Sequence, residues 1–421
     1  MAPPAHLEVE NQPKSMYMSQ VKNNVAFWLL GLLNNASYVI MIAGAVKISA
    51  SAVGLVYLCA VLPGIICKAS APYWFHKVSY SRRMVLAAFL MVMAFLFVGL
   101  GETRGVQLIG VVCAALQSSI GEASCLALTS HFHSQTSITM WSSGTGFAGV
   151  FGYAWVAFLH VIGGLSFRFT LLSALVLPLI WAYVFFQLLE SPDGRTHMIE
   201  ELFTGNSILV MDALGAEESE PLARTNDTER NSRKLSAVAR MTFKEKFMFV
   251  LGLWSYTVPL FLVYFAEYAM QSGVWTSIGF PVDDEEARHR FYVYANWMYQ
   301  GGVFVSRSSG TVWQAELSML WAMPGMQVVL LLFFGCVAVY HVLYNWGLLL
   351  PCFCTGLLGG AVYVNAFTLI SRDVPVEYKE FSLAAASVSD SIGVAAADVA
   401  GILLQGCLFK INGLQGADFK C

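Results

Sequence analysis

The chain has 421 residues, of which 57% are hydrophobic and only 12% are charged. Soluble globular domains carry about 25% charged residues, so this composition excludes an ordinary soluble protein and predicts a membrane protein with several spans. The formal net charge of −3 comes with no basic stretch of interleaved aromatic residues, so no nucleic-acid partner is expected.

Apolar segments of roughly 20 residues recur along the chain, and this is the length that a helix needs to cross a bilayer. None of them alternates apolar and polar residues as a barrel strand does, so helices are predicted throughout. An all-α, polytopic membrane protein with about eleven transmembrane helices follows. The segments lie near residues 24–46, 52–75, 84–101, 106–129, 140–163, 168–190, 247–272, 291–306, 316–339, 344–370 and 381–409.

Two stretches of the chain are too polar to be spans. Residues 1–23 form a polar tail without the apolar core of a signal peptide. Residues 191–246 contain proline, glycine, an acidic run and then a basic stretch, and a disordered linker is expected there because they cannot bury a core. This linker separates an N-terminal half of six helices, residues 24–190, from a C-terminal half, residues 247–421.

The basic residues before the seventh segment place the linker and the N-terminus in the cytosol, because lysine and arginine favour cytoplasmic loops. Two helical halves joined by a cytosolic linker are typical of major-facilitator transporters, which bind substrate near the midplane between the halves. The glycine-and-aspartate motif that many of them carry after span two is not visible, and Cys67–Lys77 stands in its place. Lys68 lies near the end of its segment, where its side chain can reach the membrane surface.

Two successive segments carry polar stripes that each follow one helical face. In the first, Tyr264, Glu267 and Tyr268 share a face, and in the second Tyr299 and Arg307 do. A charge in hydrocarbon costs roughly 2.5–3.5 kcal/mol on insertion scales, so such residues usually face a cavity or a charged partner. A wet path through the protein is one explanation, and an ion pair that only fixes helix packing is the other.

Other polar residues lie inside apolar segments. Asn34, Asn35 and Asn365 carry amides that need hydrogen-bond partners, either from another helix or from a ligand. Glu122 and Asp390 are carboxylates that can exchange a proton in a buried site, although a protonated Glu122 could also serve packing alone. Asp390 has a further alternative, which is an ion pair with the arginine of the second stripe.

Small residues recur in two segments, at Gly144, Gly146 and Gly149 and again at Gly359 and Gly360. Glycine lets helices approach closely, so these positions are expected at helix contacts. Hydroxyl groups beside the first set offer a sharper alternative, which is a site for an anionic ligand. The nine cysteines lie mostly in apolar runs without zinc-ligand spacing, so free buried thiols and no metal or cofactor are expected.

Seven stretches in order, covering almost the whole hydrophobic chain, resemble the battenin family of lysosomal and vacuolar membrane proteins. Trp-Ser-Ser-Gly-Thr-Gly, Phe-Ala-Glu-Tyr and Val-Phe-Val-Ser-Arg-Ser-Ser are the most specific motifs. The resemblance implies a major-facilitator-like fold of two halves and export of glycerophosphodiesters from the lysosomal or vacuolar lumen. Control of lysosomal pH and transport of basic amino acids are the family's older assignments. The seven stretches are Asn24–Val39, Gly121–Ser130, Trp141–Gly146, Val263–Tyr268, Tyr299–Ser309, Leu357–Phe367 and Glu380–Asp390.

The resulting hypothesis is a membrane transporter, not an enzyme, that moves a glycerophosphodiester by alternating access. Arg307 would attract the phosphate, because its planar guanidinium suits bidentate contact. Glu267 would hold Arg307 in the empty state or meet a choline-like ammonium. Hydroxyls or ring faces for the same cation would come from Tyr264, Tyr268 and Tyr299.

Glu122 is the first candidate for proton coupling, and Asp390 is the second. A porter for basic amino acids or nucleoside-like solutes is an alternative, with its cation on Glu267 or Glu122. Another is a non-transporting scaffold that binds cytosolic sorting or trafficking proteins through residues 191–246. No Ser/His/Asp set, paired aspartates or metal-ligand spacing occurs in the predicted spans, so hydrolase chemistry is not expected.

Overall fold

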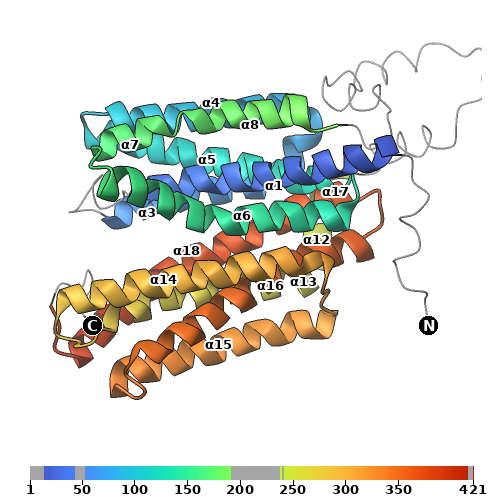
Figure 1. The fold of residues 1–421 in the computed structure, drawn as a ribbon. Helices are drawn as coiled ribbons and strands as arrows, with labels where there is room; N and C mark the ends of the chain where they lie inside the picture. The colour runs from blue at the N-terminus through green and yellow to red at the C-terminus, as the bar shows by residue number, and fades with distance from the viewer. Residues whose placement is uncertain (1–13, 43–52, 191–237, 239–240, 416–420) are drawn as a thin grey trace, which may run out of the picture.

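The computed structural model describes residues 14–42, 53–190, 238, 241–415 and 421. The regular elements of this described part are all helical, and they form two bundles that lie one above the other in Figure 1. The N-terminal bundle contains α1 (Lys14–Ile42), α3 (Val53–Trp74), α4 (Tyr80–Leu100), α5 (Arg104–Thr129), α6 (Ser134–Val156), α7 (Phe167–Ser173) and α8 (Val176–Tyr183).

The C-terminal bundle is built in the same way from long helices with short connections. Wide π-helical turns extend α6, α8 and α13 at Ala157–Ile162, Val184–Leu188 and Met270–Val274. The helices of this bundle are α12 (Phe243–Gly252), α13 (Trp254–Ala269), α14 (Glu285–Ser308), α15 (Leu317–Tyr340), α16 (Leu349–Asp373), α17 (Lys379–Ala386) and α18 (Val388–Ile411).

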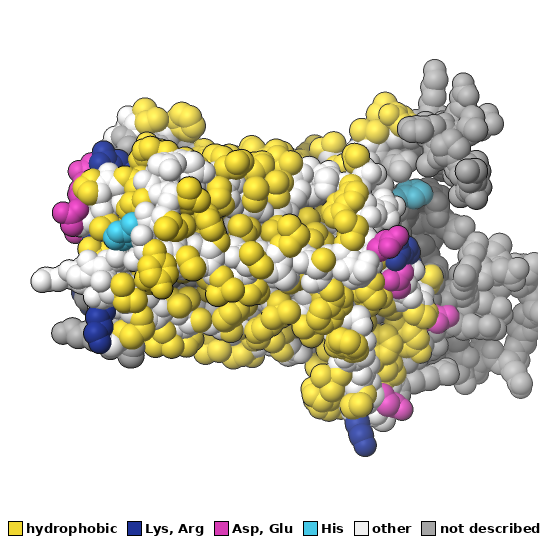
Figure 2. Space-filling model, turned by 90° about the horizontal axis from the view of Figure 1, so that it is seen from below, with side chains coloured by type: hydrophobic (Ala, Val, Ile, Leu, Met, Phe, Trp, Pro, Cys, Tyr) yellow, Lys and Arg dark blue, Asp and Glu magenta, His cyan; other side chains and the backbone are white. Residues whose placement is uncertain are grey.

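The helices agree with the predicted membrane segments. Among the described residues, seven helical stretches are long and apolar enough to cross a membrane, and α12 with α13, bent by 66° at their junction, makes an eighth. The remaining long helices α3, α6 and α14 are not in this set, but they pack against α5, α1 and α16, which are. Figure 2 shows hydrophobic side chains over the middle of the molecule and charged ones gathered at its two ends. The prediction of an all-α polytopic membrane protein is therefore confirmed.

The two bundles meet along two helix pairs. α6 packs against α14, and α3 packs against α18, while α16 and α17 add contacts to α6 and to α5. Both α1 and α12 begin at the same end of the bundles, where Lys22 forms an ion pair of 2.6 Å with Glu190. We call this end the linker end, because the described part of the N-terminal half finishes there at Glu190 and α12 begins there. The opposite end, where α14 begins and α18 finishes, is the far end.

The predicted packing glycines lie where helices approach each other most closely. A Cβ at Gly144 would overlap the backbone of α1, and Gly146 and Gly149 lie against α14 of the other half. Gly359 faces the carboxylate of a glutamate on α13, and Gly360 faces α14. Gly144, Gly359 and Gly360 contact helices of their own bundle, whereas Gly146 and Gly149 contact the other bundle, so small residues serve both kinds of packing.

Two helices begin before the predicted span boundaries. α1 starts at Lys14, inside the expected polar tail, and continues unbroken into the apolar segment. α12 starts at Phe243, inside the expected linker, because Thr242 and Glu245 form a capping box that satisfies its first N–H groups. Hydropathy marks the membrane portion of a helix, whereas capping marks its end, so the two boundaries differ.

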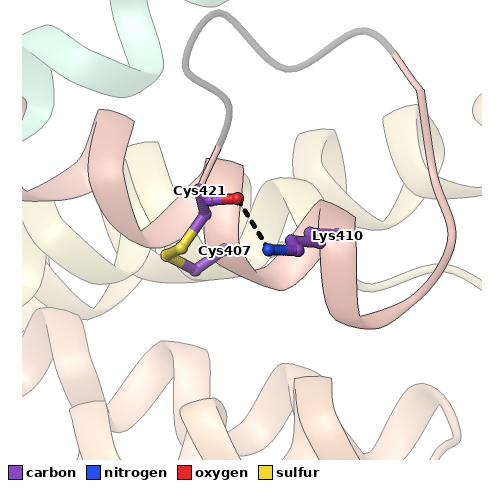
Figure 3. Close-up of a disulfide and its surroundings, with 3 residues drawn as sticks. All are labelled: Cys407, Lys410 and Cys421. Atoms are coloured by element: carbon purple, nitrogen blue, oxygen red, sulfur yellow. Dashed lines mark hydrogen bonds between the residues drawn. A yellow bond between two sulfur atoms is a disulfide. The ribbon is translucent and has the colours of Figure 1, made fainter.

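The cysteine prediction is wrong for one pair. Cys407, near the end of α18, forms a disulfide with Cys421, and the carbonyl oxygen of Cys421 accepts a hydrogen bond of 2.9 Å from Lys410 (Figure 3). The two residues are 14 positions apart in the sequence. The apolar run around Cys407 is visible in the sequence, but it gives no information on which cysteine lies close enough to bond to it.

Candidate functional site

A cavity of about 200 Å³ lies between the two bundles and is lined by both. Eight helices contribute to its wall, and four of its side chains carry charge. Its polar and charged lining residues are Asn35, Tyr38, Lys68, Ser118, Ser119, Glu122, Thr145, Tyr264, Tyr268, Tyr299, Gln300, Arg307, Tyr363, Asp390 and Ser391. Residues of the polar stripes of α13 and α14 line this cavity, namely Tyr264, Tyr268, Tyr299, Gln300 and Arg307, and Glu267 does not.

Arg307, at the end of α14, is the cation on one side of the cavity. Its guanidinium donates to the hydroxyl oxygens of Thr145 at 2.7 Å and Tyr264 at 2.6 Å, and its carbon lies 4.0 Å from the centre of the Tyr363 ring. Gly146 and Gly360 lie beside its aliphatic stem and leave room for it between α6 and α16.

No carboxylate pairs with Arg307 within the part of the chain that the structure describes, and its Nε atom is buried without a hydrogen-bond partner. Neutral oxygens and an aromatic face solvate this guanidinium but leave its charge uncompensated. Because an uncompensated buried charge is costly, the site favours the arrival of an anion.

A second charged cluster lies across the cavity and joins the two bundles. The Lys68 ammonium on α3 lies 2.6 Å from Glu122 on α5 and 3.1 Å from Asp390 on α18, and it donates to Ser391 at 2.9 Å. Lys68 is 4% exposed, Glu122 8% and Asp390 7%. One cation faces two carboxylates here, so the cluster can hold an additional positive charge such as a proton.

The structure corrects the interpretation of Lys68 and one of the two alternatives for Asp390. Lys68 does not extend to the membrane surface, because α3 continues to Trp74 and carries its ammonium into the cavity between α5 and α18. Asp390 pairs with Lys68 and not with Arg307. The alternative of a pair with Arg307 rested on charge alone, and the packing of α3 against α18 decides which cation is near Asp390.

Tyr363 on α16 connects the two charged groups. Its hydroxyl donates to Glu122 at 2.7 Å and accepts from the indole of Trp141 at 3.3 Å, while its ring covers the guanidinium of Arg307. The three hydrogen-bonding and aromatic contacts come from α5, α6 and α14. This one side chain therefore contacts the anionic cluster, the cationic site and the opposite bundle.

Glu267 occupies a different place from the one predicted. It is 1% exposed and lies behind Tyr299, whose hydroxyl donates to one of its oxygens at 2.9 Å. Its second oxygen has no hydrogen-bond partner and lies against Gly359. The predicted pair between Glu267 and Arg307 is wrong, because the guanidinium turns toward α6 and Tyr264 instead.

The other predicted residues divide into cavity and packing positions. Tyr264, Tyr268 and Asn35 line the cavity, and the rings of the two tyrosines stack at 6.1 Å. Asn34 instead donates to the backbone of α5 at 3.0 Å, and Asn365 joins α16 to the backbone of Ala315 at 2.7 Å. These two amides are fully buried in helix contacts, so interhelical bonding explains them.

Sequence reasoning missed the cavity roles of Lys68, Thr145 and Tyr363, whereas Gln300 belongs to the polar stripe of α14 that the sequence indicates. Lys68 carried a usable signal, because it is a charge inside an apolar run. Thr145 lies in the Trp-Ser-Ser-Gly-Thr-Gly motif, which was interpreted mainly as a packing motif. Tyr363 lies in an apolar segment where a tyrosine has no distinctive pattern, so only the structure reveals it.

Polar contacts between the bundles gather on the linker side of the cavity. Gln135 donates to the carbonyl of Gly310 at 3.4 Å, and the hydroxyls of Ser143 and Ser308 lie 2.8 Å apart. Further out, Glu380 at the start of α17 accepts from Tyr80 at 2.5 Å and lies 3.4 Å from His131. The linker end is thus closed by direct bonds between the halves.

Two helical halves around a polar cavity define a transporter fold of the major-facilitator type. The chain is similar to the proton:xylose symporter XylE bound to 6-bromo-6-deoxy-D-glucose, with a TM-score of 0.66 and 11% identity over 95% of this chain and 92% of that one. The human organic anion transporter MFSD10 is similar with a TM-score of 0.54 and 11% identity, covering 96% and 98% of the two chains. These likenesses confirm the fold.

The family follows from sequence comparison. The model of the CLN3 protein family matches residues 25–411, so the chain belongs to this family. Protein btn1 of Aspergillus fumigatus is 34% identical, covering 94% of this chain and 90% of its own, and battenin of Canis lupus familiaris is 31% identical, covering 95% and 94%. Membership of the battenin family, inferred from the seven stretches, is confirmed.

Proposed function

We propose that the protein exports glycerophosphodiesters across a lysosomal or vacuolar membrane by alternating access. The observation that supports this most is the guanidinium of Arg307, which lies without a carboxylate partner in a cavity lined by both halves. A phosphodiester brings one negative charge and two free oxygens, and an arginine binds such a group through two parallel hydrogen bonds. The hydroxyls of Thr145 and Tyr264, which now accept hydrogen bonds from Arg307, can donate to the bound anion or give up these bonds so that the guanidinium binds it.

The head group would lie among the aromatic residues of the same cavity. Tyr264, Tyr268 and Tyr299 come from α13 and α14, and their ring faces suit a choline-like ammonium. Their hydroxyls, with Asn35 and Gln300, suit the alcohols of glycerol or inositol. A zwitterionic or polyhydroxylated diester therefore has a partner for each part of the molecule.

Proton linkage is a second element of the proposal. Lys68, Glu122 and Asp390 carry one positive and two negative charges and connect α3 with α18. Protonation of either carboxylate would weaken its bond to Lys68 and so favour separation of the two halves. Net transport from an acidic lumen would then carry protons with the substrate, which also links the protein to lysosomal pH.

Orientation and cellular partners complete the proposal. The linker end would face the cytosol, with residues 191–246 available to sorting or trafficking proteins. The disulfide between Cys407 and Cys421 lies at the far end, and this supports a lumenal position for that end, because disulfides form and persist outside the reducing cytosol.

A porter for basic amino acids is the alternative that one observation favours. Glu267 is buried with one oxygen unpartnered, and a substrate ammonium or guanidinium could approach it if Tyr299 moved. Such a porter would carry arginine or lysine and would not transport phosphodiesters. In that case Arg307 would repel the substrate, so its removal would increase transport.

Uptake by the purified protein in proteoliposomes tests these alternatives. The substrates are glycerophosphocholine, glycerophosphoglycerol, glycerophosphoinositol, arginine and a nucleoside, each with and without a pH gradient. We expect phosphodiester flux that falls to background in Arg307→Ala and persists in Arg290→Ala, an exposed arginine of the same helix. Flux of arginine alone would support the porter alternative. If the folded protein transports none of these substrates, the result would favour the scaffold hypothesis, and the next experiment would test binding through the linker.

A further inference from the structure

A second cavity of about 220 Å³ lies at the linker end and shares no lining residue with the central one. It crosses the boundary between the halves, because α6 forms one side and α16, α17 and the turn before α15 form the other. None of its lining side chains is apolar or acidic. They are Ser134, Gln135, Gln314, Thr368, Ser371, Arg372 and Lys379.

The two cations of this cavity are available to a ligand. Lys379 is half-buried and has no ion pair or hydrogen bond in the described part of the chain. Arg372 bonds to Asp373 through Nε at 2.8 Å and through Nη2 at 3.5 Å, which leaves Nη1 of its guanidinium for the cavity. Asp373 is shared between Arg372 and the hydroxyl of Tyr256, and Glu380 binds Tyr80 of the other bundle, so neither acid pairs with Lys379.

The polar side chains of this cavity and the first turn of α6 add hydroxyl and N–H donors. Ser371 is 4% exposed, lines the cavity, and its hydroxyl has no hydrogen-bond partner among the described residues. Ser134 and Gln135 are the first residues of α6, a 23-residue helix whose N-cap His133 provides no side-chain bond to its free N–H groups. These N–H groups carry the positive end of the helix dipole.

We propose that this cavity binds a phosphate-type oxyanion that bridges the two halves. Two cations, a free hydroxyl and helix N–H groups form the set of donors that such anions prefer, and the described lining offers no carboxylate to repel them. The phosphate comes from an anionic lipid headgroup or from free inorganic phosphate, because both reach the membrane surface at this end.

Binding at this site would stabilise the closed linker end. Lys379 precedes Glu380, whose bonds to Tyr80 and His131 already hold α17 against the N-terminal bundle. Separation of the halves would move α6 away from α16 and α17 and divide the donors of the cavity. An anion that binds only the closed state shifts the population toward it. The expected effect on transport rests on the proposed function, whereas the binding itself does not.

Thermal unfolding of the purified full chain measures the binding. Inorganic phosphate is titrated in detergent, and nanodiscs of phosphatidylcholine are compared with nanodiscs that also contain a phosphatidylinositol phosphate. Phosphate-dependent stabilisation in detergent identifies the free anion, and stabilisation only in the second nanodiscs identifies the lipid headgroup. Absence of both from the wild-type protein would overturn the proposal.

Four variants separate this cavity from the central one. Loss of one charge-assisted bond should weaken binding about tenfold in Lys379→Gln, and Ser371→Ala should weaken it by less. Lys244→Gln, an exposed lysine at the same end, should bind as the wild type does. Equal binding by Lys379→Gln and Lys244→Gln, or binding lost in Arg307→Ala instead, would overturn the proposal in favour of the central cavity. Neither result depends on whether the protein transports phosphodiesters.

Discussion

Removal of the Lys68 charge is predicted to destabilise the protein strongly. The Lys68 ammonium lies 2.6 Å from Glu122 and 3.1 Å from Asp390, and the side chains of all three are at most 10% exposed. Loss of one partner from a buried ion pair costs about 3–5 kcal/mol, because the remaining charge stays buried without compensation. Lys68→Gln keeps the length and polarity of the side chain but removes the charge, so the free energy of unfolding should fall by this order.

The pair between Lys22 and Glu190 provides a matched control. Its distance is also 2.6 Å, but its side chains are 47% and 38% exposed, and such surface pairs contribute about 0–1 kcal/mol. Thermal unfolding in detergent at neutral pH compares Lys68→Gln with Lys22→Gln. An equal loss of stability in both variants would refute the view that burial makes the ion pairs of the central cluster important for stability. Lys68→Gln combined with Asp390→Asn should recover part of the loss, because one stranded carboxylate is then removed.

Three further predictions concern packing, the bridging tyrosine and the disulfide. Gly360→Ala should lower stability by about 1–3 kcal/mol in thermal unfolding, since its Cβ would overlap α14, whereas Gly335→Ala meets nothing within 4 Å and should be neutral or stabilising. Tyr363→Phe should cost about 1–3 kcal/mol, because Glu122 loses a hydrogen bond, and equal stability would contradict this bond. A reductant should lower the melting temperature of the wild type and leave that of Cys421→Ser unchanged.

The helical layout could be predicted because its physical cause acts locally. A span needs about 20 apolar residues, and this requirement can be recognised within one segment. The stripe of Tyr264 and Tyr268 and the position of Arg307 were also predictable, since residues three and four apart share a helical face. These residues do line the cavity.

The ionic partners could not be predicted, because they depend on how helices far apart in the chain are placed. Arg307 had two candidate carboxylates in the sequence, yet it contacts only hydroxyls and a ring. Asp390 is 322 residues from Lys68 along the chain, and only the packing of α18 on α3 brings them together. Asn34 and Asn365 resemble cavity amides in the sequence, and their neighbours alone make them packing residues.

The polarity of α14 has a consequence for the biosynthesis of the protein. This helix is not among those apolar enough to cross a membrane alone, and it packs against both α6 and α16. When α14 leaves the ribosome, α6 has already been made but α16 has not. A nascent chain that stops after α14 would therefore hold Arg307 without the Tyr363 ring that covers it, and stable integration of α14 has to wait for α16.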